Sequence, residues 1–388
     1  MLRRLTTPVA LAAVLAAALP APAAAQAVGP AGLPDCGEMA DALPRAAQSW
    51  AGRRPCPPRV TRTYAPKHAG LAYEVLKAED EVCFVPDEAF RELDSLIDAT
   101  IKRAGKVSKD EAGLTRLGKA FAEELIARGH HLLVPTVNLG DALLERRRTD
   151  GSRMKIVDCD TGAMILITIA RQLGFEAALV EMVTRGGDDH NYVRYALPGR
   201  ALNWDVNGVS ACATPADGPP WHNTPMSDEN VMGYVVRLRA WNWQRFDRMD
   251  LAMADWRRAA DLWPGHPAAA NEFAWTVAAG DYPGREAWKA DAVVLAQRAV
   301  ALRRDSSHLD TLACAYAFAG DFARAREAEQ DALNELPERD GSRSEYEARA
   351  ELFADGRDCS GQRTDWPTPD FDPNVAMRRS DPVSGGPR

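Results

Sequence analysis

Residues 158–205 read DCDTGAMILITIARQLGFEAALVEMVTRGGDDHNYVRYALPGRALNWD, and this segment sets the architecture that we expect for the chain. Its first part, residues 161–173, is mostly apolar over the length of a helix and stops at Gly174, a typical helix end. Strand-like segments with short turns between them then follow: 176–184, 190–197 and 201–206. One helix followed by antiparallel strands predicts an α+β core.

A cysteine, a histidine and an aspartate follow one another in this segment, as Cys159, His190 and Asp205, 31 and then 15 residues apart. A cysteine nucleophile needs such a trio, because the thiolate attacks, the imidazole takes and returns the proton, and the carboxylate orients the imidazole. Cys159 stands at the start of its helix, where backbone N–H groups and the helix dipole stabilise a thiolate and can bind an oxyanion. If the three side chains converge, they predict acyl transfer.

Two carboxylates, Asp158 and Asp160, flank the cysteine and oppose its ionisation, because a nearby negative charge disfavours a thiolate. Either of them can cap the helix, and the sequence leaves the choice between them open. The alternative to a nucleophile is a small buried cysteine, in a site that only holds the fold or binds peptides. A structural histidine and a turn aspartate are the corresponding alternatives for His190 and Asp205.

The composition is that of a soluble globular protein, with 46% apolar and 26% charged residues in a chain of 388. This length predicts two or three domains. The net charge of −8 is mildly acidic, and no basic stripe occurs, so we expect no nucleic-acid partner. No CxxC motif or Cys/His cluster has metal-ligand spacing, and we expect neither a metal nor another cofactor.

Residues 1–27 have the organisation of a signal peptide. Arg3 and Arg4 form a positive start, residues 9–19 form a short apolar run, and the alanines at 23–25 offer a cleavage site. A retained N-terminal anchor is the alternative, although the run is shorter than the roughly 20 residues of a spanning helix. We therefore expect a periplasmic or secreted protein with no membrane span after cleavage.

Seven cysteines follow the predicted cleavage site, and the odd number leaves at least one thiol without an internal partner. A nucleophile must be free, which suits Cys159. Cys36 and Cys56 flank a short segment near the N-terminus, and we predict that they form a disulfide. Cys314 lies in a helical pattern, where simple burial explains it.

The segments on either side of this core also carry predictions. Residues 28–85 are rich in Pro, Ala and Arg and predict an irregular N-terminal arm. Residues 86–148 predict helices, with apolar positions at helical spacing and a third helix from Val137 to Arg148. The histidines at 130–131 are expected at a solvated helix end.

Two further segments are predicted to lack regular structure. Residues 209–227 form a proline-containing loop, in which Trp221-His222 can border a pocket. Residues 341–388 are rich in Pro, Asp, Gly and Arg and predict a largely disordered tail.

From residue 228 onward the sequence is helical and repetitive. The repeated positions have the spacing of a tetratricopeptide unit, with small residues where two helices approach and large residues between them. One copy has Ala240, Trp243, Ala252, Trp256, Ala259 and Pro264, a longer middle copy has Phe273, Ala274 and Val277, and the last has Leu312, Ala313, Tyr316, Gly320, Ala325, Ala332 and Pro337. Glu329 stands where the pattern prefers an aromatic residue. Such units bury their surface only by stacking on neighbours.

Several blocks in this order resemble bacterial transglutaminase-like proteins that carry tetratricopeptide repeats after the core. They are LLERRR at 143–148, CDT at 159–161, IARQLG at 169–174, DHNYVR at 189–194 and NWD at 203–205. The resemblance implies an α+β, papain-like domain over residues 86–227 and an all-α repeat domain over residues 228–340. It also implies roles for individual residues: Cys159 as nucleophile, His190 as base, Asp205 as its orienting partner, and Asn138 and Trp204 as pocket or oxyanion support.

The resembling proteins include many that have lost the cysteine and are not enzymes, whereas this chain keeps all three residue types. The turn at residues 186–189 before His190 is unlike the shorter turn of the family. The resemblance therefore leaves two functions open. The first is an exported, cysteine-dependent enzyme that hydrolyses or transfers amides of a peptide or protein substrate. The second is a scaffold with an inert core, whose repeats bind a periplasmic protein partner.

Overall fold

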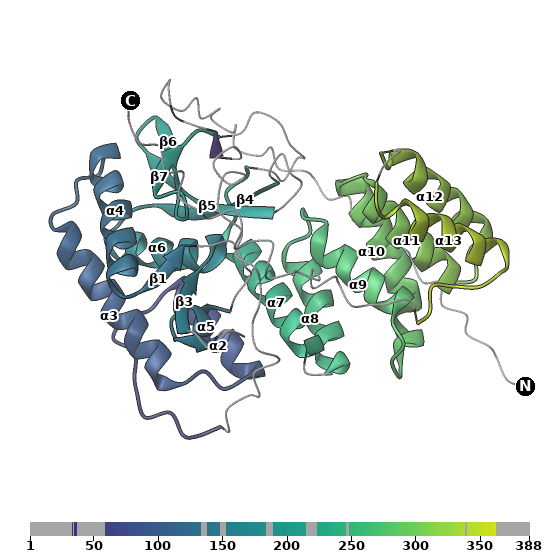
Figure 1. Cartoon of the computed structure of the whole chain (residues 1–388), viewed down its shortest axis with the longest axis horizontal. Helices are drawn as coiled ribbons and strands as arrows, with labels where there is room; N and C mark the ends of the chain where they lie inside the picture. Colours follow the sequence, from purple (N-terminus) through teal and green to yellow (C-terminus); the bar gives the residue numbers. More distant parts are fainter. Residues whose placement is uncertain are drawn as a thin grey trace, which may run out of the picture.

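The structure is a computed structural model. It describes residues 33, 35–36, 59–132, 138–147, 153–183, 189–214, 223–245, 248–337 and 340–361. The predicted signal peptide, Cys56, Trp221-His222 and residues 362–388 lie outside this part. An α+β region is followed by a succession of helices (Figure 1), as the sequence predicts. None of the helices in the described ranges is both long and apolar enough to cross a membrane.

Four longer helices build the core of the α+β region: α2 (Leu71–Val82), α3 (Asp87–Ala104), α4 (Glu111–Ala127) and α6 (Cys159–Gln172). The apolar spacing predicts α3, α4 and α6. Helix α2 corrects the prediction of an irregular arm up to residue 85. Its buried residues Ala72, Val75 and Leu76 follow helical spacing, but the proline-rich sequence before them obscured this signal.

The main sheet is antiparallel, with the strand order β4-β5-β6-β7. Its strands are β4 (Ala177–Val183), β5 (Asp189–Leu197), β6 (Arg200–Asp205) and β7 (Ser210–Cys212). The first three match predicted strands, and β7 lies in the segment predicted as a loop. The register pairs Glu181 with Asn191 and Val193 with Trp204, so each pair shares one face of the sheet.

Helix α6 packs against one face of this sheet, next to β4 and β5 (Figure 1). That face contributes Leu179, Val193, Tyr195 and Leu202 to the main hydrophobic core. The opposite face carries a small separate cluster, which consists of Cys36, Val180, Met182, Tyr192 and Cys212. Because side chains alternate along a strand, neighbouring residues of β5 serve different faces.

A second sheet is three-stranded and has the order β1-β3-β2, with β1 (His130–Leu132), β2 (Arg146–Arg147) and β3 (Arg153–Val157). It corrects two predictions. Among the described residues, the segment predicted as a helix from Val137 to Arg148 contains only the short helix α5 (Leu139–Ala142) and then β2. His130 is buried in β1 and does not lie at a solvated helix end; burial lowers the pKa of its imidazole to about 4. Both differences arise from pairing with β3, because β1, which contains His130, and β2 are its two neighbours in the sheet.

Where both cysteines are described, two disulfides join distant parts of the chain, Cys36 to Cys212 and Cys314 to Cys359, and Cys83 is also disulfide-bonded. The predicted pairing of Cys36 with Cys56 is therefore wrong, and Cys314 is more than a buried thiol. Asp35 forms a parallel bridge with Ala213 beside β7, and this long-range contact brings Cys36 to its partner. Among the described residues, Cys159 is the free cysteine.

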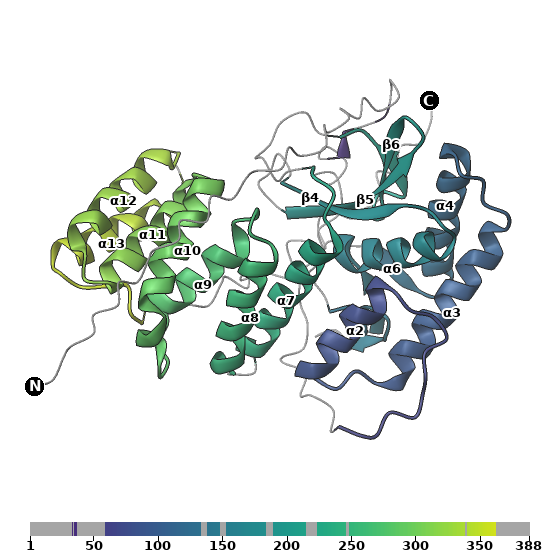
Figure 2. The ribbon, with the colours of Figure 1, turned by 180° about the vertical axis from the view of Figure 1, so that it is seen from behind.

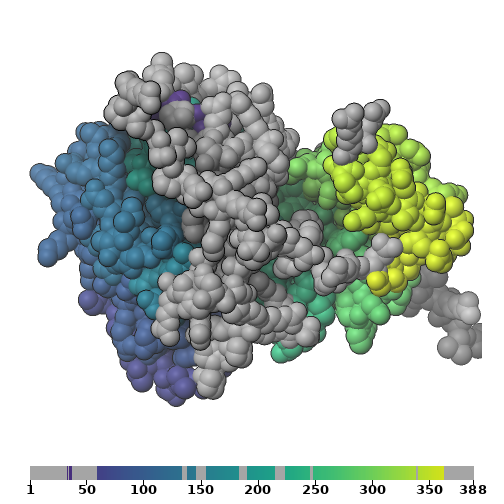
Figure 3. All heavy atoms as spheres, viewed as in Figure 1, coloured from purple at the N-terminus to yellow at the C-terminus, as the bar shows by residue number. Residues whose placement is uncertain are grey.

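The second part of the chain consists of helices that pack on their neighbours in sequence. They are α7 (Asp228–Arg245), α8 (Met249–Leu262), α9 (Ala268–Ala279), α10 (Lys289–Leu302), α11 (Ser306–Phe318), α12 (Phe322–Glu335) and α13 (Arg343–Ala354). Alanines predicted at close helix contacts are fully buried, among them Ala252, Ala259, Ala313 and Ala325. Helix α13 and the bonded Cys359 correct the prediction of a disordered tail from residue 341. Figure 3 shows the last helices, in yellow, gathered at one end of the molecule.

Helix α7 belongs to both parts of the molecule. Tyr234 and Val235 lie in the core of the α+β region, together with Trp263 from the end of α8. Val236 and Ala240 lie in the core of the helical part. Figures 1 and 2 show α7 between the two parts from both sides. Helix α7 and the residues that follow α8 therefore join the two parts.

The last helices bury two carboxyl groups, Asp310 of α11 and Glu329 of α12, against Arg349 of α13. Burial, and then the charge of Asp310, raise the pKa of Glu329. Burial also raises the pKa of Asp310, although the Arg349 charge opposes this. A carboxyl group whose pKa is higher in the folded protein than in the unfolded chain loses its proton at a lower pH when the chain is unfolded. Its contribution to stability is therefore complete below the unfolded pKa and is lost as the pH rises through the folded pKa.

We expect Glu329→Gln to change the melting temperature little at about pH 4 and to raise it increasingly toward about pH 8, because the amide cannot ionise but can still donate to Asp310. Thermal unfolding across this pH range measures the effect. Glu327→Gln is the matched control, since Glu327 is exposed on the same helix, and it should shift nothing. An increase in the melting temperature of Glu329→Gln that is the same at every pH would contradict the prediction.

Candidate functional site

Cys159 is the first residue of α6, and the cap before it fixes its position. The Asp158 carboxylate accepts the Thr161 backbone N–H at 2.9 Å and the Thr161 hydroxyl at 2.6 Å. The Thr161 hydroxyl oxygen accepts the Asp158 backbone N–H at 3.1 Å, which completes a capping box. The structure thus selects Asp158 as the cap, and the Asp160 carboxylate makes other contacts.

His190 and Asp205 form a buried pair at the ends of β5 and β6. The His190 Nε2 and the Asp205 Oδ2 lie 2.7 Å apart, and the two side chains are 2% and 0% exposed. The other oxygen of the carboxylate accepts the Gly208 backbone N–H at 2.8 Å. The carboxylate is therefore held at both oxygens, and it orients the imidazole through Nε2. Nδ1 is the ring nitrogen that remains for chemistry.

The Cys159 sulfur lies at the start of β5, where the Asn191 backbone N–H donates to it. His190 directly precedes Asn191, but the two side chains leave the strand on opposite faces. His190 is paired with Met182, on the face of the Cys36 cluster, whereas the Asn191 side chain reaches α6. Within the part of the chain that the structure describes, no hydrogen bond joins the Cys159 Sγ to the His190 ring.

The Cys159 thiol donates instead to Asp160, with 3.2 Å between Sγ and Oδ1. The cysteine is 7% exposed. Burial, and then the charges of Asp160 and Asp158, raise the pKa of the thiol well above its ordinary value, whereas the Asn191 N–H lowers it. The surroundings of the thiol therefore oppose the ionisation that its place at the helix terminus is expected to favour.

Two donors that the sequence analysis missed hold the Asp160 carboxylate. The Asn191 Nδ2 donates to Oδ1 at 2.5 Å, and the Tyr234 hydroxyl of α7 donates to Oδ2 at 2.6 Å. The Asn191 Nδ2 also lies 3.3 Å from the Tyr234 hydroxyl oxygen. Asn191 follows His190 in the sequence, and this position could have identified it as a residue of the site. No local signal points to Tyr234, because it comes from a helix distant in the sequence.

The two residues predicted as pocket or oxyanion support have other contacts. Asn138 forms a reciprocal amide pair with Asn242 of α7, with N···O distances of 3.2 and 3.1 Å. The Trp204 indole packs in the hydrophobic core against Gly118 of α4, where a Cβ would collide with the ring. Asn138 therefore joins the α+β region to α7, and Trp204 is a core residue, in place of the predicted roles.

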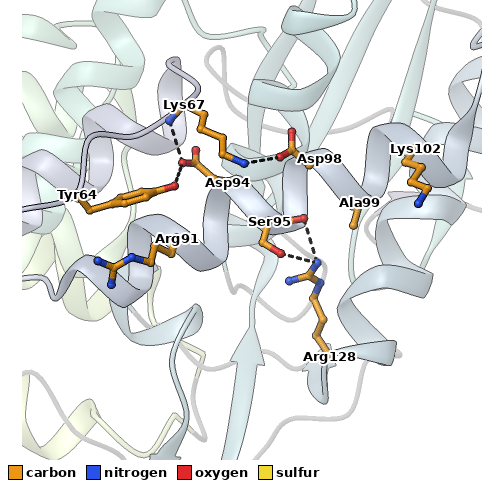
Figure 4. Close-up of a pocket in the computed structure, with 9 residues that line it drawn as sticks. All are labelled: Tyr64, Lys67, Arg91, Asp94, Ser95, Asp98, Ala99, Lys102 and Arg128. Atoms are coloured by element: carbon orange, nitrogen blue, oxygen red, sulfur yellow. Dashed lines mark hydrogen bonds and ion pairs between the residues drawn. The ribbon is translucent and has the colours of Figure 1, made fainter.

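A shallow pocket of about 330 Å³ lies over α3 (Figure 4). Asp94, which lines it, accepts the Tyr64 hydroxyl and the Lys67 backbone N–H. The Lys67 ammonium pairs with Asp98 at 3.3 Å, and Arg128 donates to the Ser95 carbonyl at 3.0 Å. These groups already bind one another and fasten the segment before α2 onto α3. None of Cys159, His190 and Asp205 lines this pocket.

Across the described ranges, no group of three or more His, Cys, Asp or Glu side chains is placed to hold a metal ion. No protein-family model matches the sequence, and no curated protein matches it.

Proposed function

We propose that this protein is a cysteine-dependent acyl-transfer enzyme with a transglutaminase-like, papain-like core, which acts on amides of peptides or proteins. The observation that carries the proposal is the buried His190–Asp205 pair together with Cys159, a free cysteine that stands at the start of a helix and whose sulfur accepts the backbone N–H of Asn191, the residue after His190. A carboxylate that fixes one imidazole nitrogen leaves the other to act as a base. In the first turn of α6 the Asp158 cap accepts the Thr161 N–H, whereas the N–H groups of Cys159 and Asp160 precede the first intrahelical hydrogen bond, which suits the binding of an oxyanion.

In the proposed reaction, the thiol first exchanges its hydrogen bond with Asp160 for one with the His190 Nδ1. The imidazole takes the thiol proton, the sulfur attacks the amide carbonyl carbon, and the imidazolium protonates the leaving amine. A thioester of Cys159 remains. Water or an amine then attacks this thioester and transfers a proton to His190. The proton returns to the sulfur as the acid or the new amide leaves.

Replacing Cys159 with alanine is expected to lower turnover by about a thousandfold or more and to leave the fold intact. His190→Ala should cause a comparable loss, because the two residues act as a unit. The assays are amide hydrolysis of peptides and incorporation of an amine into a protein. His131→Ala is the control, since His131 is exposed on β1. Full activity of the Cys159 variant would end the proposal.

One observation favours a second function, a scaffold with an inert core. The thiol donates to a carboxylate and its pKa is raised, which is the reverse of an activated cysteine. In such a protein the helices would carry the function by presenting a surface to a protein partner. No turnover by the folded wild-type protein in either assay would favour the scaffold.

The proposal extends to the other parts of the chain. The paired helices with buried alanines support a tetratricopeptide-repeat domain that binds a protein partner. The disulfides support an exported protein, in the periplasm or secreted, because such bonds persist in oxidising compartments.

A further inference from the structure

Helix α7 reaches the thiol site from the helical part of the molecule through Tyr234. The tyrosine is 3% exposed, and its ring packs edge-on against Trp263, with centroids 6.2 Å apart. Trp263 stacks on His266 at 3.8 Å, and the His266 Nε2 lies 2.8 Å from a carboxylate oxygen of Glu181. Glu181 is the cross-strand partner of Asn191. The helical part thus contacts Asn191, whose N–H donates to the sulfur, directly through Tyr234 and indirectly through Glu181.

The Tyr234 hydroxyl donates a hydrogen bond to the Asp160 carboxylate at 2.6 Å. Burial, and then the charges of Asp160 and Glu181, raise the pKa of the phenol well above its ordinary value. Its acceptor is the Oδ2 of Asp160, whose Oδ1 accepts the Cys159 thiol and the Asn191 amide. One oxygen of Asp160 therefore faces the helical part, and the other faces the nucleophile.

We propose that Tyr234 is a positioning residue for the nucleophile, which holds the Asp160 carboxylate against the Cys159 thiol and thereby withholds the thiol from His190. This inference rests on the proposed function and adds a link from the helical part to the sulfur. Asp160 is partly exposed, so its carboxylate can turn toward solvent when the hydroxyl no longer holds it. A displacement of α7 would have the same effect as removal of the hydroxyl.

Each element packed around the thiol contributes titratable or polar groups. They are Asp158 and Asp160 on α6, His190 and the Asn191 N–H on β5, Asp205 behind the imidazole on β6, and Tyr234 on α7. Tyr234 in turn faces Glu181 and Arg237. One carboxylate, that of Asp160, is bonded directly to the thiol and to the Tyr234 hydroxyl, whereas Asn191 contacts the hydroxyl at 3.3 Å through its amide and the sulfur through its backbone N–H. We take the carboxylate as the route by which a change at Tyr234 reaches the sulfur.

The test follows ionisation of the Cys159 thiol, by the ultraviolet absorbance of the thiolate and by iodoacetamide alkylation across the pH range, with C159S as the blank. Asp160→Asn removes the nearest negative charge and is expected to lower the midpoint by about one pH unit or more. Tyr234→Phe removes only the hydroxyl and should lower the midpoint by a smaller amount. Added to Asp160→Asn, it should have no further effect, because Tyr234 acts through Asp160.

Tyr195→Phe is the matched control. Its hydroxyl is also buried, with no hydrogen-bond partner among the described residues, and its loss should leave the thiol profile unchanged. A Tyr234→Phe midpoint equal to or above that of the wild type overturns the inference, as does a shift that adds to the Asp160→Asn shift. These measurements need no substrate, so they stand apart from the turnover of Cys159→Ala, which decides the proposed function.

Discussion

Replacing Asp205 with asparagine is expected to lower turnover by about three to four orders of magnitude while the fold remains. One oxygen of this carboxylate accepts the Gly208 N–H, and the other faces the His190 Nε2. In the variant, the amide oxygen keeps the Gly208 bond, and the amide NH2 group faces Nε2. Nε2 must then accept, so the ring proton moves to Nδ1, which can no longer take the proton of the thiol.

The loss should appear in kcat, with KM for an amide substrate almost unchanged, because the pair does not bind the ground state. Asp94→Asn is the matched control, a buried aspartate of the same region that binds the hydroxyls of Tyr64 and Tyr73. It should lower the melting temperature and leave the turnover of the folded protein as it is. An Asp205→Asn variant with wild-type kcat would show that the pair is structural.

The second large effect is expected on stability, from removal of the disulfide between Cys36 and Cys212. The two cysteines are 176 residues apart in the sequence, so the bond excludes many conformations of the unfolded chain. In the chain-entropy treatment, Cys36→Ala with Cys212→Ala should lower the free energy of unfolding by up to about 5 kcal/mol. Both side chains are also buried, so their truncation adds lost packing. Urea unfolding followed by circular dichroism measures the change.

The disulfide between Cys314 and Cys359 provides the control. Its cysteines are 45 residues apart, which predicts a smaller effect of about 4 kcal/mol. Because this bond lies in the helical part, its removal should spare the pairing of His190 with Asp205. Removal of the Cys36–Cys212 bond should loosen β7, the strand that pairs with β6 at Asp205. Equal stability of the wild type and the Cys36/Cys212 variant would contradict the expectation.

Features that depend on neighbouring residues were predictable. The apolar run up to Gly174 predicts α6, and its polar start places Cys159 at the helix terminus. Pro198-Gly199 turns the chain between β5 and β6, and this hairpin brings His190 to Asp205. Short elements were missed, such as β7 and the strand at His130, because a strand of three residues exists only through its partner.

The sequence by itself determined the α+β core, the helix that presents the sulfur and the hairpin that joins the imidazole to its carboxylate. Periodicity and turn residues act over a few positions, so a single segment contains this information. Only the tertiary structure decided the state of the thiol. Asp160 accepts a hydrogen bond from the thiol because Asn191 and Tyr234, from β5 and α7, hold the carboxylate there. Burial by the same packed elements raises the pKa of the thiol, and no local pattern encodes either contact.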